Sequence, residues 1–212
     1  MNIILLGFPG AGKGTQAEKL VEKYNFRHIS TGDLIRNEIA LGTPLGKKVE
    51  TTINSGNLVS DELILDMLIN AIKDEKRSVI FDGFPRTLAQ AEALDRYLAM
   101  HGSKVDSVVL IDLNGEEVLK RLTSRRVCKE CGAVYNIYAP DYTGKCTKCG
   151  GGLYTRHDDD EHSAKHRLEV FDKETKPLIE YYTKSGLCKT VDGSKNKEGV
   201  FDEIVSVLNL SK

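Results

Sequence analysis

The sequence predicts an α/β fold in which a doubly wound parallel sheet with a P-loop is flanked by helices. Continuous apolar runs of strand length recur at Ile3–Leu6, Val79–Phe81 and Val108–Ile111, with helical periodicity between them. Strands that alternate with helices pack as a parallel sheet covered on both faces. The first run also leads through a glycine-rich stretch, residues 7–15, directly into a helix, which is the setting of a phosphate-binding loop.

Helical patterns follow this loop. Apolar residues at the spacing of one buried helical face predict the first helix: Ala17, Leu20, Val21 and Tyr24. Residues 30–59 hold turn-forming glycines and a proline, and they predict a short helical insert. A further helix is predicted over Leu63–Ile72, with Ser60 as its capping candidate.

The second half of the chain contains a segment without helical period. Residues 122–159 hold four of the cysteines, several glycines and a proline, and they predict a small irregular or β-rich module. Helical spacing resumes from Ala164 to Tyr182. Pro177 should break or kink that helix, because proline lacks the backbone N–H that a helix interior needs.

The composition narrows the class of protein. The chain has 212 residues, of which 40% are hydrophobic and 29% charged, with 5 prolines and 19 glycines. These values exclude collagen-like, disordered and repeat proteins. The net charge of −1 argues against a nucleic-acid binder or a basic membrane-surface protein. The N-terminal apolar run is too short for a signal core or a membrane span, so we expect a reducing, cytoplasmic location.

The charge is unevenly distributed along the chain. Ten Lys or Arg and six Asp or Glu lie between Lys120 and Arg167, which gives this segment a charge of +4 and the remainder −5. A basic segment on an acidic body indicates an anionic ligand.

Residues 7–15, GFPGAGKGT, have the chemistry of a phosphate cradle. Glycines let backbone N–H groups approach phosphate oxygens, the helix N-terminus adds partial positive charge, and Lys13 adds a full charge. Gly14 stands where Ser or Thr would normally ligate magnesium, so we expect Mg²⁺ to be held mostly through waters and phosphate oxygens. Asp82, at the end of the second apolar run, is the candidate for ordering those waters. The alternatives are a glycine-rich turn that binds nothing and, for Asp82, a helix cap.

Arginines recur in separate segments of the chain. They are Arg36, Arg86, Arg121, Arg125, Arg126, Arg156 and Arg167. Singly, each is better explained as a solvated surface residue, but several that converge would suit phosphoryl transfer, where charge must be neutralised and oxygens aligned. The histidines form no recognisable triad. A phosphate monoester acceptor has a second pKa near ~6, so its attacking oxygen needs no base at neutral pH.

The cysteines have zinc-ribbon spacing. Cys128 and Cys131 form one Cys-x2-Cys pair, and Cys146 and Cys149 form a second after fourteen intervening residues. Four thiolates fill a tetrahedral shell, so the predicted Zn²⁺ is structural. Disulfides are the alternative, and a reducing compartment disfavours them. Cys188 is interpreted as a buried, apolar-like residue outside the metal site.

Five stretches together resemble the adenylate kinases, of the long bacterial type with a zinc-bearing lid, from Met1 to about Leu208. The stretches are residues 7–15, His28–Arg36, Phe81–Gln90, Leu122–Arg126 and Arg156–Arg167. The resemblance implies reversible transfer of the γ-phosphoryl of MgATP to AMP, giving two ADP. It further implies a monomer that binds ATP, AMP and ADP but no nucleic acid or membrane.

The resemblance also implies an arrangement of domains. Residues 1–29, 60–121 and 160–212 would form the core, residues 30–59 a mobile insert that holds AMP, and residues 122–159 a lid that closes over ATP.

Site residues are implied by position. ATP would meet Gly10, Ala11, Gly12, Lys13, Gly14, Thr15, Arg121, Arg125, Val134, Tyr135 and the backbone at Lys195. AMP would meet Thr31, Arg36, Asn57, Leu58, Val59, Gly83, Phe84, Pro85, Arg86, Gln90, Arg156 and Arg167. The expected catalytic residues are Lys13, Asp82, Arg86, Arg125, Arg156 and Arg167, and Asp158 and Asp159 would anchor the closed lid. Gln90 would favour adenine over a pyrimidine through the paired donor and acceptor of its amide.

The sequence departs from the family pattern at few positions. His166 stands where a second basic residue commonly precedes the arginine, and Cys149 stands where some relatives have Asp. Two other functions stay open: a UMP/CMP or other nucleoside monophosphate kinase, and a nucleotide-dependent switch whose zinc module binds a partner.

Overall fold

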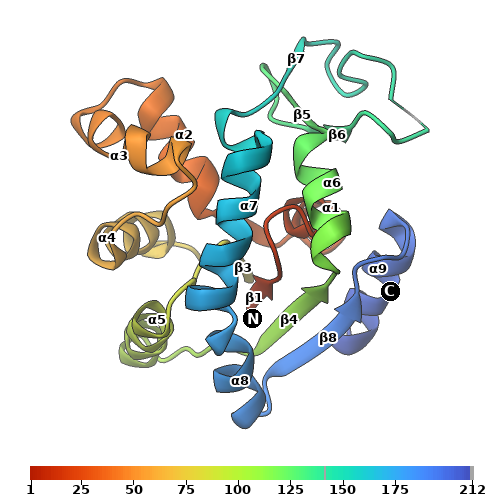
Figure 1. Cartoon of the computed structure of the whole chain (residues 1–212). Coiled ribbons are helices and arrows are strands. Elements are labelled where there is room, and N and C mark those ends of the chain that lie inside the picture. Colours follow the sequence, from red (N-terminus) through yellow and green to blue (C-terminus); the bar gives the residue numbers. More distant parts are fainter. Residues whose placement is uncertain (141, 211–212) are drawn as a thin grey trace.

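The computed structural model describes residues 1–140 and 142–210, and within them the central sheet has five strands in the order β2-β3-β1-β4-β8 (Figure 1). All neighbouring pairs in this sheet run parallel. The strands are β1 (Asn2–Leu6), β2 (Arg27–Ser30), β3 (Val79–Asp82), β4 (Ser107–Asp112) and β8 (Cys188–Asp192). The predicted parallel α/β fold and the strands at the three apolar runs are confirmed.

Helices cover both faces of this sheet. They are α1 (Lys13–Tyr24), α2 (Thr31–Ala40), α3 (Pro44–Asn54), α4 (Asp61–Ile72), α5 (Leu88–Met100), α6 (Gly115–Thr123), α7 (Glu161–Val170), α8 (Pro177–Lys184) and α9 (Lys197–Val207). Every residue of β1 is buried, and successive side chains enter opposite cores. Ile4 and Leu6 pack with residues of α2 to α5 and α8, whereas Ile3 and Leu5 pack with residues of α1, α6 and α9. The sheet is therefore doubly wound.

The two segments that interrupt the core both lie beyond the carboxyl ends of the strands. In Figure 1, α2 and α3 stand on one side of the upper end of α7, and a small second sheet stands on the other. The second sheet is antiparallel, in the order β6-β5-β7, and its strands are β5 (Arg125–Cys128), β6 (Val134–Asn136) and β7 (Leu153–Tyr154). The helical character predicted for residues 30–59 and the β-rich character predicted for residues 122–159 are confirmed.

Close backbone packing holds α2 against α3. A side-chain Cβ at Gly46 would lie 2.2 Å from the backbone oxygen of Glu38, so only glycine fits there. Thr43 caps α3 by accepting a hydrogen bond from the Gly46 N–H at 2.9 Å.

Pro177 interrupts the last long helical stretch, as predicted. A π-helical segment, Phe171–Thr175, follows α7, and Pro177 starts α8. Ser60 precedes α4 as predicted, but its side chain makes no capping hydrogen bond. Cys188 begins β8 outside the cysteine cluster and packs against the apolar core, but it is only partly buried, so the expectation of a buried residue was wrong.

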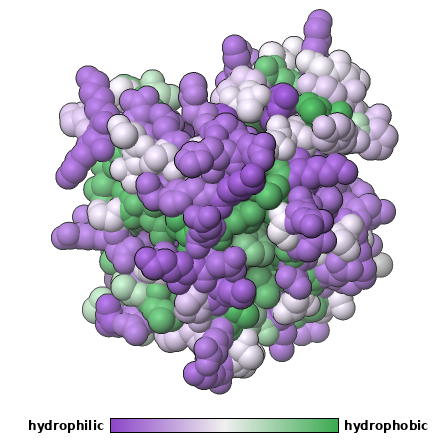
Figure 2. All heavy atoms as spheres, in the orientation of Figure 1, coloured by the Kyte–Doolittle hydropathy of each residue, from purple (hydrophilic) through white to green (hydrophobic). Residues whose placement is uncertain are grey.

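Hydrophilic residues cover most of the face drawn in Figure 2. Apolar residues are visible on this face in the area between α4 and α7. No helix in the described ranges combines the length and the apolar character that crossing a bilayer requires.

Candidate active site

The glycine-rich loop joins β1 to α1 in the strand-to-helix setting that the sequence predicted. Gly7, Gly10 and Gly12 have φ values of 141°, 86° and 101°, which glycine adopts more readily than other residues. A Cβ at Gly7 would also lie 2.6 Å from the backbone oxygen of Ile111. The Lys13 ammonium donates hydrogen bonds to the backbone oxygens of Gly7 and Phe8, each at 2.9 Å, and so lies over its own loop.

Lys13 lies in a strongly cationic environment. Burial is the largest cause that lowers the pKa of Lys13 from 10.5 to about 8. Three arginines lower it further: Arg86, Arg167 and Arg125. The charge of Asp82 acts in the opposite direction and raises the pKa. A bound polyphosphate would add further negative charge beside the ammonium and so raise the pKa of Lys13 again.

Asp82 occupies the end of β3, beside the loop. A Cβ at Gly14 would lie 3.5 Å from an Asp82 carboxylate oxygen, and the second-strand residue His28 approaches the same oxygen with Nε2 at 3.2 Å. Burial acts to raise the pKa of Asp82, but the His28 hydrogen bond and the Lys13 charge outweigh it, so the pKa lies below its ordinary value. Asp82 therefore offers a carboxylate near the loop.

The predicted arginines meet from different elements. Arg86 follows β3, Arg125 begins β5, and Arg167 lies on α7. Burial, followed by the charges of Arg125 and Arg36, lowers the pKa of Arg156 to about 10. Among the described residues, the buried Nε of Arg156 has no hydrogen-bond partner. The positive charges of these arginines therefore repel one another, and the guanidinium groups can donate hydrogen bonds to an anion.

Two aspartates partly neutralise this arginine cluster. The Asp159 side chain is 0% exposed and accepts hydrogen bonds from Arg125, through Nε at 2.7 Å and through Nη2, and from Arg167 at 3.3 Å. Asp158 pairs with Arg167 at 2.8 Å. Both aspartates precede α7, while Arg125 lies at the base of the small sheet, so these pairs join the sheet to the core.

A pocket beside the arginines brings together most of the residues expected to contact AMP. It is lined by Thr31, Ile35, Ile53, Asn57, Leu58, Val59, Ile64, Gly83, Arg86 and Gln90. The Thr31 hydroxyl donates to the backbone oxygen of Gly83 at 2.9 Å, which fixes one edge of the pocket. Arg36 pairs with Asp33 at 2.5 Å, and Arg156 approaches the same carboxylate at 3.8 Å.

Some of the residues predicted to contact ATP or AMP have side chains that lie apart from the arginine cluster and the pocket. The Phe84 side chain is 1% exposed and packs in the core, next to the cis Phe84–Pro85 bond. Arg121 pairs with Glu117 on its own helix at 3.1 Å. Lys195 lies in the loop between β8 and α9, and the first residue of α9, Lys197, accepts a hydrogen bond from Gln16 on α1 through its backbone oxygen at 3.1 Å.

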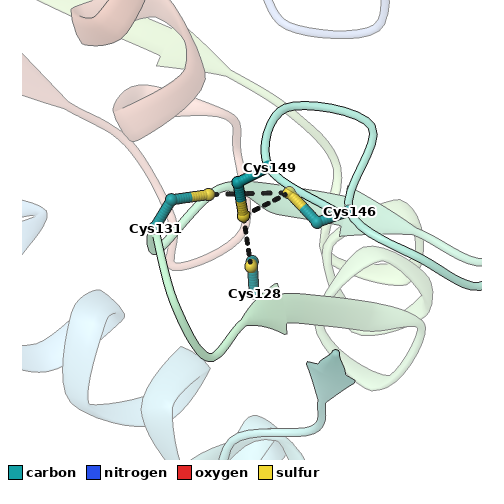
Figure 3. A group of neighbouring side chains, drawn as sticks. All are labelled: Cys128, Cys131, Cys146 and Cys149. Carbon is teal, nitrogen blue, oxygen red and sulfur yellow. Dashed lines mark hydrogen bonds between the residues drawn. The ribbon is translucent and has the colours of Figure 1, made fainter. Parts of the chain in front are cut away.

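The four cysteine sulfurs converge from two tight turns of the small sheet (Figure 3). They lie within 4.8 Å of one another, and adjacent sulfurs are 3.5 Å apart. Zinc–sulfur bonds of about 2.3 Å in a tetrahedron place sulfurs about 3.8 Å apart, so the donor set fits Zn²⁺. A disulfide would need sulfurs about 2.05 Å apart. The cluster can therefore bind zinc.

Tyr135 supports the cysteine cluster, a role that the sequence did not suggest. Its hydroxyl lies 3.2 Å from the sulfur of Cys146 and accepts the backbone N–H of Thr147 at 3.0 Å. Val134, its neighbour on β6, is 38% exposed. Hydrogen bonding, led by that of Tyr135, lowers the pKa of Cys146, whereas hydrogen bonds within the cluster raise the pKa of Cys149, so Cys146 is the thiol of this pair that more readily becomes the thiolate a metal needs.

Sequence reasoning also missed the contacts of His28 and Asp61. His28 belongs to no triad in the sequence, yet it contacts Asp82. Asp61 accepts hydrogen bonds from Gln90 at 2.6 Å and from Thr87 at 3.0 Å. No spacing rule connects these pairs, because each spans different elements.

A phosphate loop that faces converging arginines, with a second pocket beside them, is suited to moving a phosphoryl group between two bound molecules. The fold and the site thus define the chain as a P-loop phosphotransferase.

Comparison with known proteins narrows this class. The adenylate kinase family model matches residues 5–187. The chain is 49% identical to an adenylate kinase of Archaeoglobus fulgidus over the full length of both, and 47% identical to one of Elusimicrobium minutum, also over the full length of both. It is 49% identical to one of Clostridium tetani over 98% of each chain. The chain belongs to the adenylate kinase family and is a nucleoside monophosphate kinase.

Proposed function

We propose that this chain transfers the γ-phosphoryl of MgATP to AMP, reversibly, through the cluster of Lys13 and the arginines. The observation that carries the proposal is that Arg86, Arg125 and Arg167 all lie near enough to Lys13 to lower its pKa. Such a concentration of positive charge is costly unless an anion neutralises it. Family membership supports ATP, AMP and ADP as the substrates.

Different site residues would bind the two nucleotides. The loop Gly10–Thr15 and Lys13 hold the donor phosphates, and Arg36 and Arg86 hold the phosphate of AMP. Arg125, Arg156 and Arg167 offset the charge that spreads over the transferred group. Mg²⁺ brought by ATP would supply further charge neutralisation, with Asp82 as the residue that orients its waters. The attacking phosphate oxygen is already ionised, which agrees with the lack of a required base.

The domain assignment is part of the proposal. Residues 30–59 would hold AMP and residues 122–159 would close as a lid over ATP, and the 3.8 Å approach of Arg156 to Asp33 supports their meeting. Closure excludes water, which would otherwise compete as the acceptor. Val134, Tyr135, Arg121 and Lys195 remain predicted ATP contacts.

We further propose that the cysteine cluster holds a structural Zn²⁺. Apart from two cysteines, the buried apolar residues of the small sheet within the described ranges are Val127 and Ala133, so packing alone gives it little stability. Free thiols in this arrangement favour a reducing, cytoplasmic setting. The monomeric state stays a prediction.

Two measurements test the function. With Mg²⁺ and ADP alone, the protein should produce ATP and AMP in equal amounts, whereas a nucleotide-dependent switch would at most hydrolyse ADP. With ATP as donor, AMP should give a higher kcat/KM than UMP or CMP. Comparable values for the three acceptors would reject AMP as the cognate acceptor in favour of a broader nucleoside monophosphate kinase.

A further inference from the structure

The side-chain amide of Gln90 is held at both ends. Its oxygen accepts the backbone N–H of Arg86 at 2.7 Å, and its nitrogen donates to the Asp61 carboxylate at 2.6 Å. Gln90 is 3% exposed and lines the pocket beside the arginines. The amide thus lies in the wall of the proposed acceptor site with little freedom to turn.

The chemistry of the two partners fixes which end of the amide is oxygen. A backbone N–H only donates, so the atom beside Arg86 must be the acceptor. A carboxylate only accepts, so the atom beside Asp61 must be the NH2 group. Turning the amide over would place N–H against N–H at one end and oxygen against carboxylate at the other. Both contacts would then become repulsive.

The other oxygen of Asp61 supports the same arrangement. It accepts a hydrogen bond from the Thr87 hydroxyl at 3.0 Å, and that hydroxyl accepts the backbone N–H of Gln90 at 3.2 Å. Thr87 is the N-cap of α5, and Asp61 is the first residue of α4. One carboxylate therefore ties the start of α4 to both the backbone and the side chain of Gln90.

A fixed amide presents one pattern to a base. The oxygen keeps one free lone pair and the nitrogen one free N–H, because each has used its other position. Adenine offers an amino group at position 6 flanked by ring-nitrogen acceptors, which matches this pattern. A 6-oxo purine offers an acceptor at position 6 and an N–H at position 1, which needs the opposite orientation of the amide.

We propose that Asp61 is a positioning residue for base selection, which locks the Gln90 amide in the orientation that accepts 6-amino purines and rejects 6-oxo purines. This inference rests on the proposed function, since it places the acceptor base against Gln90. Without the lock, a glutamine amide could turn over to suit either base. Selection therefore depends on a residue outside the proposed base contacts.

The experiment measures AMP and IMP as acceptors with MgATP as donor. IMP replaces the 6-amino group of AMP by an oxo group and N1 by N1–H, so it isolates the contact. The wild-type protein should prefer AMP over IMP in kcat/KM by about 10- to 100-fold, the discrimination typical of a bidentate base contact. Asp61→Ala should reduce that preference about 10-fold, since a hydrogen bond to a charged acceptor is lost while the Arg86 N–H still favours the original orientation.

Asp61→Asn is the matched variant. It removes the negative charge from the first turn of α4 but keeps an oxygen that accepts from Gln90, so it should retain most of the preference for AMP. The KM for ATP should stay unchanged in both variants, and the change in preference should appear in the acceptor KM. A melting curve for each variant checks folding, and Asp61→Ser replaces Asp61→Ala if the alanine protein does not fold.

The pair of variants distinguishes the lock from an effect of charge at the start of α4. An AMP-to-IMP preference that is unchanged in Asp61→Ala overturns the inference. An equal fall in Asp61→Asn and Asp61→Ala also overturns it, because charge at the helix start would then be responsible. If wild-type protein phosphorylates AMP and IMP equally, the lock is wrong while the proposed function stands; if it phosphorylates neither, the proposed function itself fails.

Discussion

Replacement of Asp159 by asparagine tests whether the buried ion-pair cluster joins the small sheet to the core. The Asp159 side chain is fully buried and accepts hydrogen bonds from Arg125 and Arg167. Asparagine has the same shape but carries no charge, and its NH2 group would face guanidinium donors. Removing one partner of a buried ion pair costs about 3–5 kcal/mol, because the remaining charge stays buried and unpaired.

The loss should be visible in both equilibrium and thermal unfolding. For a chain of this size, about 1 kcal/mol corresponds to a shift of about 2–4 °C in the melting temperature, so Asp159→Asn should melt roughly 6–20 °C below the wild type. Urea unfolding followed by circular dichroism, without nucleotide, gives the free energy directly.

Glu161→Gln is the control for this substitution. Glu161 lies two residues away and pairs with Lys165 at 2.7 Å, but its side chain is 73% exposed. Exposed pairs contribute little, so the free energy of unfolding should stay within error of the wild type. A loss of less than about 1 kcal/mol in Asp159→Asn would refute the assignment of Asp159 as a buried anchor, given the cost expected for such a pair.

The remaining predictions concern the metal and the phosphate loop. A chelator should lower the melting temperature of the small sheet before it alters the chemical step, and metal analysis that finds no zinc in reduced, purified protein would contradict the structural Zn²⁺. Lys13→Ala should fold normally but lose several orders of magnitude in turnover in a coupled assay, and near-normal activity would exclude its role. Phosphates favour charged Lys13, whose pKa without nucleotide is about 8. ATP binding should therefore be tightest below pH 8 and should weaken as the pH rises above it in wild type but not in Lys13→Ala; calorimetry at pH 7 and 9 that shows equal wild-type affinity would oppose this.

The sequence predicted the interior of the fold better than its edges. The apolar runs of β1, β3 and β4 are buried almost throughout, so their pattern was readable. β2 and β8 lie at the edges of the sheet and bury only Ile29 and Val191, so neither shows an apolar run. Edge strands are defined by their partner rather than by their own composition.

The contacts of the site also fall into those that the sequence predicted and those that it did not. The phosphate loop and the cysteine pairs are local patterns, and the structure brings their members together as expected. The contact between Asp61 and Gln90 joins residues 29 positions apart, and Tyr135 reaches Cys146 across a turn. Such contacts depend on how α4, α5 and the small sheet pack, and no single-chain periodicity encodes them.

The central sheet and the small sheet obtain their stability from different sources. The body contains two large apolar cores, whereas the described part of the small sheet buries only Val127, Ala133 and two cysteines among its apolar residues. If the small sheet holds Zn²⁺ and closes over ATP as proposed, a cell starved of zinc would keep the folded core of the enzyme but lose this cover over the nucleotide. Catalytic output would then follow the supply of a trace nutrient, while protein abundance would give no sign of the deficit.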